Sequence, residues 1–205
     1  MEPAHQNLSK IVAASLLLTV VSQIVYMAAL SDIGIVEGWP LRSTIWTIEL
    51  LLFSIIATTG FASLVRTSQL HLAWAAIAVF GLVNIIQAGI GLSMFLPATE
   101  AGEDFAPLWD TVLAGAFVFF FLAKVFIGFA AMAFGLRLFR GQTSMSKGIG
   151  IITAIAGFAA VVLNIAALPQ GLALVFPGGA SGTLATLLLA VAIWLNARSE
   201  QSSSD

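Results

Sequence analysis

The chain has 205 residues, of which 60% are hydrophobic and 9% are charged, and its formal net charge at pH 7 is −2. A soluble domain carries roughly 25% charged residues because its surface faces water. This composition therefore excludes an ordinary soluble domain and favours a protein embedded in lipid. The sequence has no block of Lys and Arg that could bind phosphate groups, so we expect no nucleic-acid partner. It has no cysteine, which excludes disulfides, thiolate nucleophiles and thiolate metal ligands.

The apolar residues come in six stretches, each long enough to cross a bilayer. A helix of about 20 residues spans the roughly 30 Å of hydrocarbon. The stretches cover residues 10–30, 44–65, 71–96, 109–137, 148–168 and 180–197. We therefore predict an all-α fold, a polytopic integral membrane bundle of six transmembrane helices. The bundle is expected to form a single domain over residues 1–198, followed by a short polar C-terminal tail over residues 199–205.

The basic residues predict how the bundle is oriented. Those that flank the ends on the side of the N-terminus are Lys10, Arg66, Arg137, Arg140, Lys147 and Arg198. The opposite ends carry only Arg42 and are otherwise acidic, with Asp32, Glu37, Glu100, Glu103, Asp104 and Asp110. Because Lys and Arg concentrate in cytoplasmic segments, we expect both termini to be cytoplasmic. The predicted location is a bacterial inner membrane, in a multi-pass arrangement.

Two ionisable residues, Glu49 and Lys124, lie inside the predicted spans. Such residues are rare there, because a charge near the bilayer centre costs about 2.5 to 3.5 kcal/mol on insertion scales. Glu49 lies 17 residues before Arg66 and Lys124 lies 16 residues before Arg140, which puts both roughly 25 Å from the inner arginines. Opposite charges at one depth can offset each other's desolvation. We predict that Glu49 and Lys124 are in contact, directly or through water.

Uncharged polar residues are predicted at the same depth, in the outer half of the bundle, by the same helical rise. We call the whole set the polar layer and predict that it binds a ligand. Its members are Glu49, Lys124, Asn84, Gln87, Asn164 and Gln23.

Three interpretations of the polar layer remain open. In the first, it lines a hydrated or ligand-filled cavity that opens toward the acidic outer connections, with Glu49 as a proton or cation site and Lys124 as its charge partner. In the second, it only fastens helices together, through contacts that contribute about 0.6 kcal/mol each on average. In the third, Lys124 carries covalent chemistry such as a Schiff base.

Two segments of the sequence are similar to each other. Asn84 begins NIIQAGIGLSMFLP and Asn164 begins NIAALPQGLALVFP, so that Asn, Ile, Gly, Leu and Pro recur at identical offsets. Because both segments run in the same direction, the repeated unit would be a helical hairpin duplicated in parallel. Chance similarity is the alternative, since Gly, Leu and Ile are abundant in any membrane helix.

The sequence motifs narrow the function without naming a substrate. The sequence contains no Walker loop, no G-x-S-x-G and no H-E-x-x-H motif, and nothing in the sequence indicates a metal or a cofactor. We therefore predict an inner-membrane protein that binds or transports a small solute, ion or lipophilic ligand through the polar layer. One alternative is a non-catalytic interaction subunit of a homo-oligomer or membrane complex, in which the buried ion pair is structural. A second is an intramembrane enzyme acting on a lipid or quinone.

Overall fold

The computed structural model describes residues 3–66, 69–102, 105–141 and 143–202. Helices make up 92% of the chain and the described residues contain no strand, which confirms the all-α class. The elements are α1 (Pro3–Leu30), α2 (Trp39–Arg66), α3 (His71–Ile90), the π-helix η1 (Gly91–Phe95), α4 (Leu96–Glu100), α5 (Ala106–Phe139), α6 (Ser144–Gln170), the 3-10 helix η3 (Gly171–Leu174) and α7 (Val175–Ser202).

Five helical segments of the described chain are long and apolar enough to cross a membrane. They are Asn7–Leu30, Trp39–Arg66, His71–Glu100, Ala106–Phe139 and Ser144–Ala197. The last segment has 54 residues and contains α6, η3 and α7. These segments support a multi-pass membrane protein, as the composition predicts.

The long helices extend beyond the apolar stretches from which they were predicted. For example, α6 begins at Ser144, four residues before the apolar stretch 148–168. The Thr143 side chain caps this start by accepting a hydrogen bond from the Ser146 backbone N–H at 3.1 Å. At the other end of the chain, α7 continues to Ser202. The expected polar tail is therefore helical over its first residues, and positions 203–205 lie outside the described part.

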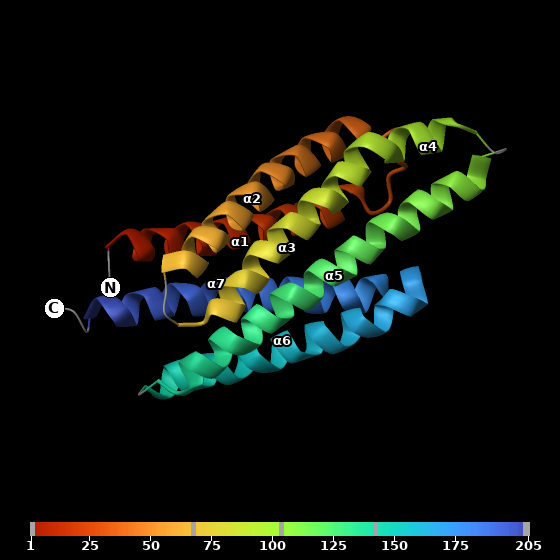
Figure 1. The fold of residues 1–205 in the computed structure, drawn as a ribbon. Helices are drawn as coiled ribbons and strands as arrows, with labels where there is room; N and C mark the ends of the chain where they lie inside the picture. Colours follow the sequence, from red (N-terminus) through yellow and green to blue (C-terminus); the bar gives the residue numbers. More distant parts are fainter. Residues whose placement is uncertain (1–2, 67–68, 103–104, 142, 203–205) are drawn as a thin grey trace.

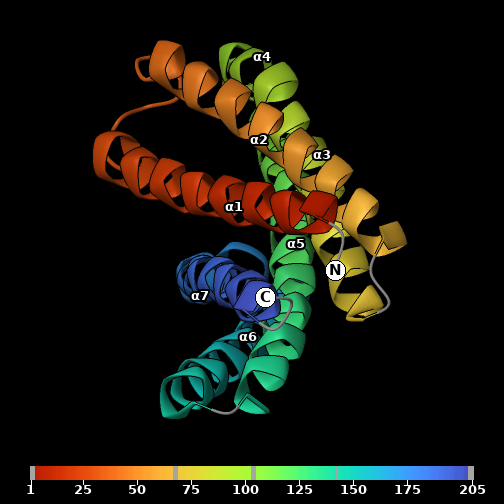
Figure 2. The same cartoon turned by 90° about the vertical axis from the view of Figure 1, so that its left-hand side faces the viewer.

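The helices pack into a ring with one helix outside it. α5 packs against α3, α6 and α7, while α1 packs against α2 and α7. The neighbours α1, α2, α3, α5 and α7 therefore close a ring, and α6 covers α5 and α7 from outside. α1 begins and α7 ends at the same end of the bundle (Figure 1), and Figure 2 shows α1 lying between α2 and α7. We call this the terminal end and the opposite one the distal end.

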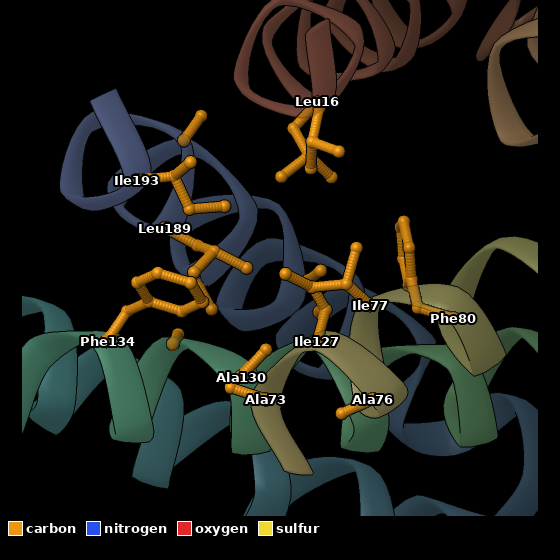
Figure 3. Packing of buried hydrophobic residues seen from close by; sticks show 14 of the residues in the cluster. Leu16, Ala73, Ala76, Ile77, Phe80, Ile127, Ala130, Phe134, Leu189 and Ile193 are labelled. Atoms are coloured by element: carbon orange, nitrogen blue, oxygen red, sulfur yellow. The ribbon is translucent and has the colours of Figure 1, made fainter. Parts of the chain in front are cut away.

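The terminal half of the ring is filled by apolar side chains. They come from all six long helices, with the largest share from α3, α5 and α7. Figure 3 shows, among others, Leu16, Ile77, Phe80, Ile127, Phe134, Leu189 and Ile193. Small residues let neighbouring helices approach closely: a Cβ on Gly157 of α6 would lie 2.6 Å from the Gly128 carbonyl oxygen of α5. This close packing holds the helices that carry the polar residues at fixed positions.

Candidate functional site

The polar layer lies distal to the apolar core. Lys124 and Asn84 are each 1% exposed and Asn164 is 0% exposed. The other members, Gln23, Glu49 and Gln87, are half-buried. Three members of the layer are thus buried and three are half-buried, and the structure divides the layer into separate groups of contacts.

Gln23 joins three helices through one oxygen atom. Its Oε1 on α1 accepts a hydrogen bond from Lys124 Nζ of α5 at 3.3 Å and another from Thr183 Oγ1 of α7 at 2.8 Å. The Lys124 ammonium therefore reaches across the ring from α5 to α1. Thr183 carries no charge or amide, so nothing in the sequence indicated that it belongs to this group.

The aliphatic part of Lys124 lies against α7. A Cβ placed on Gly182 would come within 2.3 Å of Lys124 Cδ, so only glycine leaves room for this side chain. The Nζ atom lies 5.1 Å from the centroid of the Phe120 ring, within the range of a cation–π interaction. Gly182 and Phe120 together fix the course of the side chain and the position of its charge.

Glu49 contacts the residue next to Gln23 on α1. Ser22 Oγ donates a hydrogen bond to Glu49 Oε1 at 2.5 Å. Among the residues that the structure describes, no direct ion pair joins Glu49 to Lys124, although their charges are close enough to interact. The two charged groups are instead linked through adjacent residues of α1. A bridging water between them stays a prediction.

The amides of α3 are not joined to this group by hydrogen bonds. Asn84 Nδ2 donates to the Phe80 carbonyl of its own helix at 2.8 Å. Gln87, also on α3, makes no side-chain hydrogen bond with the described residues. Equal depth in the membrane therefore did not bring these two residues into contact with Lys124.

Asn164 belongs to a second polar group, between α6 and α7. Its Nδ2 donates to the carbonyls of Ala160 at 2.8 Å and Gly178 at 3.1 Å, while Oδ1 is buried without a hydrogen-bond partner. Gly178, which faces Asn164, and Gly182, which faces Lys124, are one turn apart on α7. The glycine-rich start of α7 therefore packs against both polar groups.

Asn84 and Asn164 are alike in structure as well as in sequence. Each donates its Nδ2 to the carbonyl four residues earlier at 2.8 Å. In each case the regular α-helix gives way seven residues later, to η1 at Gly91 and to η3 at Gly171. Interrupted helices at corresponding points of two halves are typical of transporter binding sites. The duplicated hairpin itself stays a prediction.

Arg42 lies at the distal end of α2, where we expected a charge, and the structure adds the partners that it binds there. Arg42 is 5% exposed inside the bundle, and its Nη2 donates to the carbonyls of Leu30 at 2.9 Å and Ile33 at 2.5 Å. Its Nη1 donates to the Tyr26 hydroxyl, and the guanidinium lies 5.2 Å from the centroid of that ring. Arg42 thus binds carbonyls at the end of α1, which have no partner within the helix.

Aromatic rings lie between Arg42 and Glu49. Trp46, one turn from each of them on α2, stacks on Tyr26 of α1 with 5.9 Å between ring centroids. Trp46 also packs on Gly91 of η1, where a Cβ would lie 3.1 Å from the indole ring. Trp46 therefore lies one turn distal to Glu49 on α2, packed against α1 and η1.

A separate hollow lies at the distal end. Its volume is about 340 Å³, and its lining residues are Ile35, Ala98, Thr99, Gly102, Ala106 and Trp109. None of these residues belongs to the polar layer or carries a charge. The hollow therefore offers no polar recognition of the kind that Lys124 and Glu49 provide.

No protein-family model, curated protein or solved structure matches the chain. Within the described part of the chain, no group of three or more His, Cys, Asp or Glu residues is placed to hold a metal ion. The function must therefore be inferred from the polar groups themselves.

We expect Arg42→Lys to destabilise the protein by about 1.5 to 3 kcal/mol, the usual cost of losing hydrogen bonds to a charged group. Lysine keeps the charge but cannot donate to two carbonyls and the Tyr26 hydroxyl from a planar fork. The matched control is Arg66→Lys, at an exposed position on the same helix, which should change stability by less than about 0.5 kcal/mol. The measurement is the free energy of unfolding in mixed micelles, and equal effects of the two substitutions would contradict the role of Arg42.

Proposed function

We propose that the chain is a bacterial inner-membrane protein with six crossings and cytoplasmic termini. The sixth crossing is supported by η3, which separates α6 (27 residues) from α7 (28 residues), and by the packing of these two helices against each other. Each is long enough to span the hydrocarbon alone. The orientation is supported by the bias of Lys and Arg toward the terminal end.

The lack of native cysteines makes this topology directly testable. Ala101→Cys places a thiol at an exposed position of the distal end, and Ser144→Cys places one at an exposed position of the terminal end. With an impermeant maleimide added to spheroplasts, we expect Ala101→Cys to be labelled at once and Ser144→Cys only after permeabilisation. The reverse pattern, or labelling of both in intact spheroplasts, would contradict the proposed topology.

We further propose that the protein binds or transports a small solute, ion or lipophilic ligand at the group formed by Lys124, Gln23, Thr183, Glu49 and Ser22. The observation that carries this proposal is the incomplete use of the buried ammonium. An ammonium has three N–H donors, and among the described residues Lys124 has one hydrogen-bond acceptor, the Gln23 amide oxygen. The remaining capacity allows a further polar partner to bind.

The structural alternative is that the same residues only fasten helices. It is supported by Gln23, whose single oxygen joins α1, α5 and α7. Such a role would suit an interaction subunit in a homo-oligomer or membrane complex. The enzyme alternative has less support, since no catalytic set accompanies Lys124 among the described residues.

Substitutions that remove one charge at a time distinguish ligand binding from fastening. We expect wild-type protein, extracted in mild detergent, to carry a small co-purified mass in native mass spectrometry. Glu49→Gln and Lys124→Met should each still fold but change the amount of this bound mass, because each removes a charge from the proposed site. The exposed control Lys147→Met should retain it.

Two results would contradict the binding proposal. One is wild-type protein without any bound small mass. The other is a double variant, Glu49→Gln with Lys124→Met, that regains the stability lost in the single variants and retains the mass. In that case the two charges serve only to neutralise each other.

A further inference from the structure

We propose, as an extension of the proposed function, that the ligand is a small monovalent cation of the primary ammonium type, and that Lys124 competes with it for the same acceptors. In this view the Lys124 ammonium is a tethered occupant of a cation site. A ligand binds by taking its place beside Gln23, and Lys124 is released from α1 as it does so.

The groups around Lys124 Nζ are acceptors. Gln23 presents its amide oxygen at 3.3 Å, and the Phe120 ring presents its negative face with the centroid at 5.1 Å. The orientation of the Gln23 oxygen is fixed by Thr183, whose hydroxyl proton is already donated to it. A site that offers an oxygen and a ring face selects a cation with N–H donors.

Glu49 adds a negative charge beside this acceptor set. Its carboxylate is held by the Ser22 hydroxyl, next to Gln23 on α1, and it interacts electrostatically with the Lys124 charge. An anionic ligand at Lys124 would be repelled by this carboxylate. A cation that replaces the Lys124 ammonium keeps the same favourable interaction.

The Lys124 ammonium is held weakly enough for a cationic ligand to displace it. Within the described part of the chain it makes a single hydrogen bond, at the end of a flexible four-carbon chain, whereas Arg42 makes three. The distal connections also carry exposed acidic residues, which raise the local concentration of cations. These are Asp32, Glu37, Glu100 and Asp110.

The test is chemical rescue of a truncated lysine. Lys124→Ala deletes Cγ, Cδ, Cε and Nζ, and n-propylammonium has the same four heavy atoms. We expect n-propylammonium chloride to raise the Tm of purified full-length Lys124→Ala by several degrees, saturably, relative to NaCl at equal ionic strength. Wild-type protein and the exposed control Lys147→Ala should show a much smaller rise at the same concentration, because in both the ligand must first displace the tethered Lys124 ammonium.

Two matched comparisons isolate the charge. 1-Propanol has the same size but no charge, and should not raise the Tm of Lys124→Ala. Adding Glu49→Gln to Lys124→Ala should reduce the response to n-propylammonium at least several-fold. Equal rescue by 1-propanol, an undiminished response in the double variant, or no rescue at all would overturn the proposal.

If Lys124→Ala does not survive extraction, the readout becomes the yield of monodisperse protein. Extraction with n-propylammonium should then restore the yield, while 1-propanol should not, and failure to restore it would overturn the proposal. The rescue experiment is independent of the measurement of a co-purified mass. If wild-type protein carries a bound mass but n-propylammonium does not rescue Lys124→Ala, the proposed function stands and the ligand belongs to another class. If n-propylammonium rescues Lys124→Ala but wild-type protein carries no bound mass, the cation site stands and the proposed function does not.

Discussion

The buried ammonium of Lys124 is the constraint on which the distal half of the bundle depends. A charged group removed from water must be solvated by the protein, because its cost in hydrocarbon is not otherwise offset. Here the solvation comes from three directions: the Gln23 oxygen of α1, the Phe120 ring of its own helix and the field of Glu49 on α2. The helices around Lys124 are positioned so that these groups converge on one atom.

Several features that have no charge of their own follow from this constraint. Gly182 has no side chain because the lysine stem passes over it, and Thr183 directs its hydroxyl at the oxygen that Lys124 also uses. Toward the distal end, Trp46 of α2 stacks on Tyr26 of α1, and Arg42 of α2 donates hydrogen bonds to carbonyls at and after the end of α1. The apolar core at the terminal end is tightly packed. The polar group therefore lies between the apolar core and the stacked rings of Trp46 and Tyr26.

The position of a residue along its helix could be predicted from the sequence. The face of the helix on which its side chain lies could not. Hydrophobic length predicted the helices, and a constant rise per residue placed Glu49 and Lys124 in the same region of the bundle. Depth does not specify which face a residue occupies, so Asn84 bonds only its own helix while the unremarked Thr183 reaches Gln23. The partners of Arg42 were missed for a related reason, because the position of a charge at a helix end does not show whether the guanidinium turns inward to bind backbone carbonyls.

The most direct test is to determine whether the Lys124 ammonium lies beside the Gln23 side chain when the protein is in a bilayer. Lysine occurs only at positions 10, 124 and 147, so Lys10→Arg with Lys147→Arg leaves Lys124 as the single lysine. With ¹⁵N at lysine Nζ and ¹³C at glutamine Cδ, solid-state NMR reports the dipolar coupling between the two side chains. The account predicts strong coupling that disappears in Gln23→Leu. Absence of coupling in the protein that retains Gln23 would mean that the ammonium lies elsewhere and would contradict the account.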